Sequence, residues 1–320
     1  IVRHGKWFVI APAIILLVGV ILFFVPGVGF NLGLDFTGGS IIKVTPEGLN
    51  ADTKDDFIEK IQAVMNEQGV KADVTMEKNT SGGNVLTVKF SETETETTNK
   101  IIEQLKTVTE FSGIGVVSEP DTISASTSSE KIVDIMLAVL AALVCIMIYM
   151  LFRFKFTSGV SAIISLFHDV LVMASLVIVF RVQVNASFIA ALITIVGYSI
   201  NNTLVLFDRI RSYEKINSNN YNLEQIIDKS IKDTMGRTMI TTATTLVPVV
   251  VLAICSIFMQ LSSLWEFSIP IVFGLIAGTY SSVFLSTTMY LRFEGARLIN
   301  KKRKLNTNVN KNKNANKQSI

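Results

Sequence analysis

The chain has 320 residues, 49% of them hydrophobic and only 17% charged, and a mean hydropathy of +0.48, which excludes an ordinary water-soluble domain. The formal net charge of +3 comes largely from the C-terminal tail, so it does not indicate nucleic-acid binding. The two cysteines, Cys145 and Cys255, lie in apolar stretches and predict no disulfide framework.

Six apolar segments are long enough to cross a membrane, since a bilayer core about 30 Å thick needs about 20 apolar residues in a helix. The first is too long and too well flanked for a cleaved signal. The sequence therefore predicts a polytopic α-helical membrane protein with six transmembrane helices. The six segments are Trp7–Val25, Ile132–Leu151, Gly159–Phe180, Ser187–Phe207, Met239–Phe258 and Phe267–Leu291.

Basic residues gather on one side of this arrangement. Arg3 and Lys6 precede the first segment, Arg153 and Lys155 follow the second, and a basic tail follows the sixth. Because cytoplasmic loops are enriched in Lys and Arg, we expect both termini in the cytoplasm and residues 31–131 on the opposite side of the membrane. The expected division is a first span within 1–30, an extracytoplasmic domain over 31–131, a five-helix bundle over 132–292 with a cytoplasmic loop 208–238, and a disordered basic tail over 293–320.

The sequence pattern of residues 31–131 predicts a small α+β domain. The order is a strand at "SIIKVT", a helix at "ADTKDDFIEKIQAVMNEQG", two strands at "DVTMEK" and "VLTVKF" joined by "NTSGGN", a helix at "ETTNKIIEQLKTV" and an extended run at "GIGVVSEPDTIS". Strand–helix–strand–strand–helix–strand is the order of a ferredoxin-like unit. The segment contains no histidine and its acids are scattered, so we expect a binding or docking module.

The entrance to this domain is "NLGLDFTGGS", residues 31–40. Gly33, Gly38 and Gly39 are expected to supply positive φ angles as the chain leaves the membrane. Asp35 is interpreted as a turn cap, with cation binding as the alternative. No Gly-Lys-Ser/Thr follows, which excludes a phosphate-binding loop, and no nucleophile–base pair or metal cluster stands out anywhere. We therefore expect no enzyme, no cofactor and no metal.

Two ionisable residues, His168 and Asp169, fall near the middle of the third segment. A charged side chain at the bilayer centre costs about 2.5–3.5 kcal/mol on insertion scales, so such residues usually face the bundle interior and carry function. A titratable role in a cation path is the favoured interpretation. Simple hydrogen bonding between helices is the alternative.

Polar side chains also form stripes on the fourth and fifth segments. Thr194, Tyr198 and Asn202 are spaced i, i+4, i+8 and so share one helix face. We expect the two stripes to line a shared hydrated seam that relays or coordinates a cation, or simply to fasten the helices together. Arg237 could instead extend to the membrane surface. On the fourth segment, Gly197 and Asn201 line the adjacent stripe. The stripe on the fifth segment consists of Arg237, Thr241, Thr244, Thr245 and Pro248.

Two further features are interpreted as structural. Gly274 and Gly278 give the sixth segment a small-residue face for close helix packing. Residues Asn222–Met235 place their apolar side chains on one face, which predicts a cytoplasmic amphipathic helix lying along the membrane.

Four motifs together resemble the bacterial SecF family. They are "LGLDFTGG" after the first segment, "FHDV" in the third, "GYSINNT" with "FDRIR" at the end of the fourth, and "RTMITTATTL" at the start of the fifth. The resemblance implies a membrane subunit of the resistance–nodulation–division superfamily that acts in protein export and uses cation flow across the membrane. The implied partners are SecD, the Sec channel (SecY, SecE, SecG) with SecA, YidC and YajC-type subunits, the exported preprotein and the lipid bilayer.

The sequence departs from the family at Asn202. SecF proteins commonly have Asn-Asp-Thr where this chain has Asn201-Asn202-Thr203. The resemblance implies that the family's aspartate takes part in proton movement together with the arginine that matches Arg237. An amide cannot ionise, so coupling through SecD, coupling to another cation and loss of coupling all stay open. Two alternative functions are also compatible with the sequence: a small-molecule or lipid exporter of the same superfamily, and an uncoupled structural partner of SecD.

Overall fold

The computed structural model describes most of the chain. Arg3, Lys6, most of the "NTSGGN" turn and the basic tail after residue 300 lie outside the described residues, so the expectations that rest on them are not addressed by the structure. The described residues are 10–46, 48–50, 52–78, 83–91, 94–110, 116–118, 121–123, 125–216 and 222–300.

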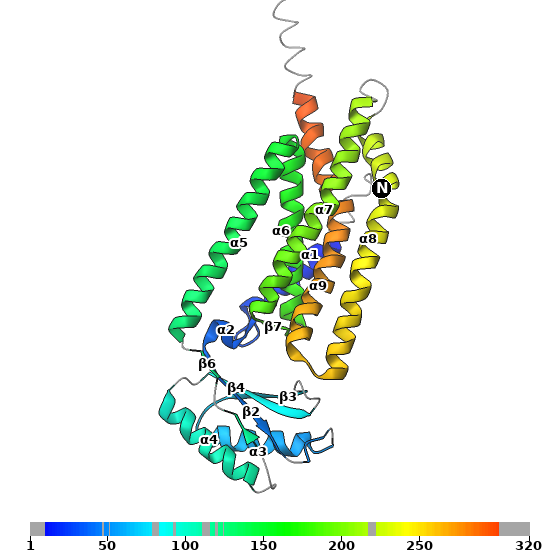
Figure 1. Cartoon of the computed structure of the whole chain (residues 1–320). Coiled ribbons are helices and arrows are strands. Elements are labelled where there is room, and N and C mark those ends of the chain that lie inside the picture. The colour runs from blue at the N-terminus through cyan, green and yellow to red at the C-terminus, as the bar shows by residue number, and fades with distance from the viewer. Residues whose placement is uncertain are drawn as a thin grey trace, which may run out of the picture.

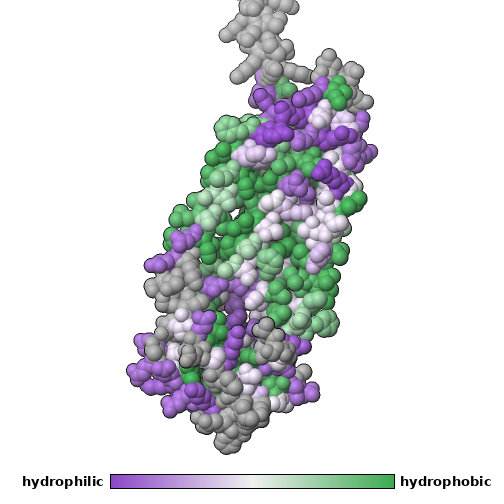
Figure 2. Space-filling view, in the orientation of Figure 1, coloured by the Kyte–Doolittle hydropathy of each residue, from purple (hydrophilic) through white to green (hydrophobic). Residues whose placement is uncertain are grey.

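The larger part of the fold is a bundle of long helices (Figure 1). Among the described residues, five stretches are long and apolar enough to cross a membrane, and the described part of the first apolar helix is shorter. A hydrophobic surface covers the middle of the bundle between hydrophilic ends (Figure 2), as a protein in a bilayer requires. The helices are α1 (Ile10–Phe24), α5 (Ala125–Arg153), α6 (Phe156–Val179), α7 (Ala186–Ile216), α8 (Leu223–Met259) and α9 (Ser262–Tyr280), which continues through a π-helical turn at Ser281–Leu285 and on to Asn300.

A small α+β unit sits at one end of the bundle (Figure 1). Its strands are antiparallel in the order β3-β4-β2-β5, and β6 also pairs with β2. The alternation of β2 and β4 turns one face of the sheet, with Ile42, Val44 and Leu86, toward the two helices, where it forms a buried core with Ile61 and Ile101. The elements are β2 (Gly39–Thr45), α3 (Lys54–Glu67), β3 (Ala72–Lys78), β4 (Asn84–Phe90), α4 (Thr95–Glu110), β5 (Val116–Val117) and β6 (Asp121–Ile123).

Short elements tie this unit to the bundle. Strand β1 (Asn31–Leu32) pairs in parallel with β7 (Gln183–Val184), which lies between α6 and α7. Helix α2 (Leu34–Thr37) follows, and its Asp35 accepts a hydrogen bond of 3.0 Å from the backbone N–H of Ala186 at the start of α7. Asp35 therefore caps a helix 151 residues further along the chain.

The three glycines at this entrance serve different purposes. Gly38 and Gly39 have φ angles of 74° and 142°, as expected. The expectation for Gly33 is wrong, because its φ is −76°. Its role is close approach: a Cβ atom there would lie 3.1 Å from the Cβ atom of Asn185 and 3.2 Å from the carbonyl oxygen of Val184.

Most of the expected loop 208–238 is helical. Helix α7 runs to Ile216, and α8 begins at Leu223 and continues into the fifth apolar segment. The apolar face of the first turns of α8, including Ile227 and Ile231, is buried against Ile210 and neighbouring residues. The prediction of a separate amphipathic helix lying along the membrane is therefore wrong, because protein and not lipid covers that face.

Candidate functional site

The carboxylate of Asp169 is fully buried near the middle of α6. Its Oδ1 atom lies 3.1 Å from Nδ1 of His168, and its Oδ2 atom accepts a hydrogen bond from the hydroxyl of Ser199 on α7. Helix α9 comes close at Gly278, where an added Cβ atom would lie 3.5 Å from Oδ2 of Asp169. Three helices therefore enclose one ionisable group.

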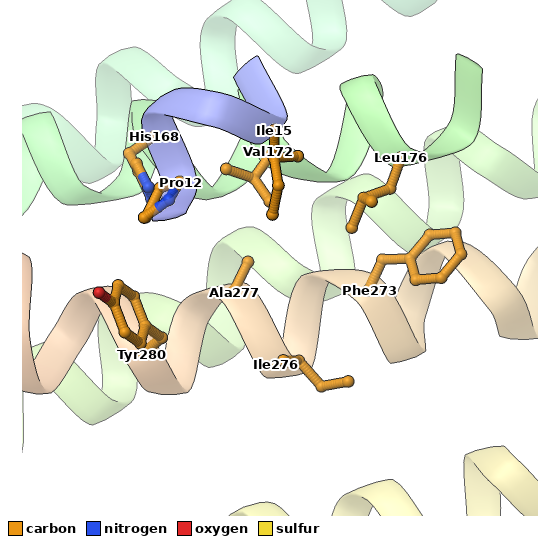
Figure 3. A pocket seen from close by; sticks show the side chains of 9 residues that line it. All are labelled: Pro12, Ile15, His168, Val172, Leu176, Phe273, Ile276, Ala277 and Tyr280. Carbon is orange, nitrogen blue, oxygen red and sulfur yellow. The ribbon is translucent and has the colours of Figure 1, made fainter. Parts of the chain in front are cut away.

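His168 connects Asp169 to an apolar cavity. Its Nε2 atom is buried and has no hydrogen-bond partner among the described residues. The ring lines a cavity of about 210 Å³ between α1, α6 and α9 (Figure 3), whose other walls include Pro12, Val172, Ala277 and Tyr280. His168 therefore lies between the carboxylate of Asp169 and this cavity.

A second polar cluster joins α7, α8 and α9. The hydroxyl of Tyr198 donates a 2.8 Å hydrogen bond to Oγ1 of Thr242, and Oγ1 of Thr242 lies 2.9 Å from Oγ1 of Thr279. Both threonines also bond to carbonyl oxygens one turn earlier in their own helices. These contacts fasten three helices at one level of the bundle.

Asn202 lies on α7 about one turn beyond Tyr198 and Ser199, which belong to the two clusters. It is three residues after Ser199 on α7, so the two residues share a helix face, and it is only 5% exposed. Its Nδ2 atom has no hydrogen-bond partner among the described residues. A buried amide hydrogen without a partner costs about 1–3 kcal/mol, which is unusual for a purely structural position.

The structure brings only part of the expected seam together. Thr194, Asn201 and Arg237 are exposed, and Arg237 makes no ion pair with any carboxylate that the structure describes. The hydroxyls of the expected stripe on α8 bond back to their own helix. Those hydroxyls belong to Thr241, Thr244 and Thr245.

The site residues predicted from the sequence do not include three members of the buried clusters, Ser199, Thr242 and Thr279. Ser199 carries a usable signal, because it precedes Asn202 by three residues on the same face. Thr242 carries a weaker one, since it adjoins the stripe in a run of threonines. Nothing in the sequence around Thr279 distinguishes its hydroxyl from those of the serines that follow.

Small residues on α9 make these contacts possible. A Cβ atom on Gly274 would lie 2.5 Å from Cγ1 of Ile195, and one on Gly278 would lie 3.2 Å from the Cβ atom of Ser199. Helix α9 therefore lies against α7 at a distance that larger side chains would prevent. This close approach seals Asp169 and Ser199 from solvent.

A long-helix bundle with a buried carboxylate and a small α+β unit at one end defines a multi-pass membrane protein of the transport class. Residues 103–296 match the family described as "Protein export membrane protein SecD/SecF, C-terminal", and residues 23–47 match the "SecD/SecF GG Motif". The chain belongs to the SecD/SecF family.

Similar proteins are SecF subunits. The chain is 33% identical over 306 residues to the protein translocase subunit SecF of Helicobacter pylori strain J99, covering 95% of this chain and 90% of that one. It is 32% identical to SecF of Borreliella burgdorferi over 295 residues, covering 90% and 95% of the two chains. The chain is accordingly a SecF-type protein translocase subunit of a bacterial membrane that acts in protein export, and not an enzyme.

Solved structures agree with this assignment. The crystal structure of SecDF from Thermus thermophilus, a translocon-associated membrane protein, superposes with a TM-score of 0.74 at 26% identity. The match covers 92% of this chain but only 38% of the SecDF chain. SecDF in its super-membrane-facing form gives a TM-score of 0.65 at 26% identity, covering 95% and 39% of the two chains.

Proposed function

We propose that this subunit promotes preprotein translocation together with SecD and the Sec channel, using the ion-motive force, and that Asp169 is the group that takes up and releases the proton. This proposal rests on the complete burial of Asp169 between His168 and Ser199. Partnership with SecD is supported by the SecDF structures, of which this chain matches 38–39%.

Protonation is the chemistry that this site can perform. A carboxylate held away from water is costly, and a proton removes that cost, so the occupancy of Asp169 can bias how tightly α6, α7 and α9 pack. The membrane potential supplies about 2.3 kcal/mol per charge per 100 mV, which is enough to shift a two-state equilibrium substantially. His168 provides the connection to the cavity beside α1.

A second candidate function is that of a structural partner of SecD without coupling of its own. The observation that favours it is Asn202, an amide at a buried position beside the two polar clusters. An amide cannot carry a proton, so any path through α7 would have to rely on Asp169 or on groups supplied by SecD.

We also propose the finer architecture predicted above. The strand order β3-β4-β2-β5 with all pairs antiparallel supports a ferredoxin-like domain within residues 31–131, and α1 supports a sixth span. The basic residues at the end of the bundle opposite the sheet support a cytoplasmic position for that end. They include Arg153, Lys155, Arg209, Arg211 and Lys215.

The test compares Asp169→Asn with Asp169→Glu in vesicles that contain SecD, the Sec channel and a secreted reporter. The amide keeps the size of the side chain but cannot titrate, so we expect loss of the export that a protonophore abolishes in the unmodified protein. The glutamate should retain part of it. If Asp169→Asn exports normally and keeps its sensitivity to protonophore, Asp169 is not the coupling group and the structural-partner function is favoured.

A further inference from the structure

The end of the bundle opposite the sheet contains a basic pocket that the proposed function does not use. The turn between α5 and α6 and the last turns of α7 line an open pocket of about 420 Å³. We call it the α5–α7 pocket. Its lining residues are Phe152, Arg153, Phe154, Lys155, Arg211, Glu214 and Lys215.

Part of the positive charge in this pocket is not neutralised. Lys155 pairs with Glu214, whose other oxygen accepts a 2.6 Å hydrogen bond from Tyr290. Arg153 faces Asp208 at 3.6 Å. Four basic side chains and two carboxylates leave a formal charge of +2.

Two of the cations are available to a ligand. Arg211 and Lys215 lie one turn apart on α7, and neither pairs with a carboxylate among the described residues. Arg211 makes one long contact, 3.4 Å, to the backbone carbonyl of Arg153. A guanidinium and an ammonium on one helix face form a suitable site for a phosphate group.

The walls beside the pocket are apolar and exposed. Phe152 is 88% exposed although it lines the pocket, and Ile148, one turn earlier on α5, is 49% exposed. Phe156 at the start of α6 is also exposed, and very little of the apolar stretch of α5 is buried by the described protein. Positive charge therefore lies beside an exposed apolar surface.

We propose that the α5–α7 pocket binds an anionic phospholipid, with Arg211 and Lys215 on the headgroup phosphate and the acyl chains along Ile148 and Phe152 of α5. A formal charge of +2 complements one or two phosphates, and basic pockets between helices at a membrane surface are suited to anionic headgroups. The apolar path along α5 distinguishes a lipid from a soluble phosphate. The site does not include Asp169 and does not depend on proton coupling.

The test uses the full chain, delipidated in a non-ionic detergent and titrated with dioleoyl-phosphatidylglycerol, with bound lipid counted by native mass spectrometry. Dioleoyl-phosphatidylcholine and glycerol 3-phosphate are titrated in parallel. We expect Arg211→Gln/Lys215→Gln to weaken phosphatidylglycerol binding about tenfold or more. The charge-preserving Arg211→Lys/Lys215→Arg variant should keep most of the phosphatidylglycerol binding. That result would show that substitution at these two positions does not by itself disrupt the pocket.

The matched control is Lys232→Gln/Arg292→Gln, which removes two exposed positive charges from the same end of the bundle. It should bind phosphatidylglycerol as the unmodified protein does. Equal loss in the control would show a general charge effect and overturn the site. If phosphatidylcholine binds as tightly as phosphatidylglycerol, the pocket does not recognise the anionic headgroup. If glycerol 3-phosphate binds as tightly as phosphatidylglycerol, the pocket is a site for soluble phosphates.

Discussion

Ser199 on α7 donates a hydrogen bond to Oδ2 of Asp169 on α6, and both side chains are buried. The serine thus supplies one of the two polar contacts that compensate the carboxylate for its loss of water. Gly278 on α9 lies directly against the pair, so the contact is enclosed from a third side.

Ser199→Ala should lower the stability of the purified protein by about 1–2 kcal/mol, because it leaves one carboxylate oxygen of Asp169 without its donor. The measurement is the thermal unfolding midpoint in detergent at constant lipid content.

The control is Ser165→Ala, one turn before Asp169. The hydroxyl of Ser165 is buried but has no hydrogen-bond partner among the described residues, so its removal should be neutral or slightly stabilising. Equal effects of the two substitutions would show that the contact between Ser199 and Asp169 does not stabilise the bundle.

Gly274→Ala should destabilise the bundle by about 1–3 kcal/mol, because the new methyl group would overlap the side chain of Ile195. Gly197→Ala is the control, since no atom lies within 4 Å of a Cβ atom there, and helix propensity favours alanine. Unfolding in detergent compares the two. A neutral Gly274→Ala would show that the side chain of Ile195 can move aside without cost to the packing of α9 against α7.

The long-helix architecture could be predicted from the sequence because twenty apolar residues leave few alternatives. The ends of α7 and α8 could not. The stretch Asn222–Met235 has the pattern of a surface helix, but it forms the first turns of α8, and Ile227 and Ile231 pack against α7. Periodicity identifies an apolar face but not whether lipid or protein covers it.

The candidate site could be predicted in part for the same reason. Asp169 and His168 stand out because charge is costly in a membrane, and they do lie together. The threonines of α8 do not stand out individually, because any hydroxyl in a helix can bond to its own carbonyls. Which hydroxyl crosses to another helix, Thr242 and not Thr241, depends on helix rotation.

Asp35→Ala should destabilise the start of α7 by about 0.5–2 kcal/mol, because it removes the acceptor for the backbone N–H of Ala186. Asp35→Asn should be much milder, since an amide oxygen also caps a helix. Hydrogen exchange of the first turn of α7 is the measurement. Exchange that is equally fast in both variants would indicate that the negative charge, and not the cap, is what matters.

Topology can be read from two single cysteines in a chain whose Cys145 and Cys255 are replaced by serine. Lys71→Cys, in the exposed turn before β3, should react with an impermeant maleimide added outside intact cells stripped of any outer barrier. Asn222→Cys, before α8, should react only after the membrane is opened. The opposite labelling would invert the proposed orientation, and labelling of both from outside would exclude an odd number of spans between them.

Asn202→Asp should be tolerated and should make export more dependent on the proton gradient. Helices α7 and α8 are antiparallel neighbours that meet at Tyr198 and Thr242, so Asn202, four residues along α7, lies near the level of Thr238 and Arg237 on α8. The position is buried and has an unpartnered Nδ2 atom, so a carboxylate there would replace an amide that is already poorly satisfied.

The partner for that new charge would be Arg237, which makes no ion pair with a described carboxylate. Arg237→Ala in the Asn202→Asp background should therefore abolish the gain, while Arg237→Ala alone should have less effect on protonophore sensitivity. Reporter secretion with and without a protonophore measures all three variants. If Asn202→Asp prevents insertion or assembly with SecD, the position is a dry helix contact that cannot hold a charge. If it assembles but leaves the gradient dependence unchanged, protons do not pass along this face of α7.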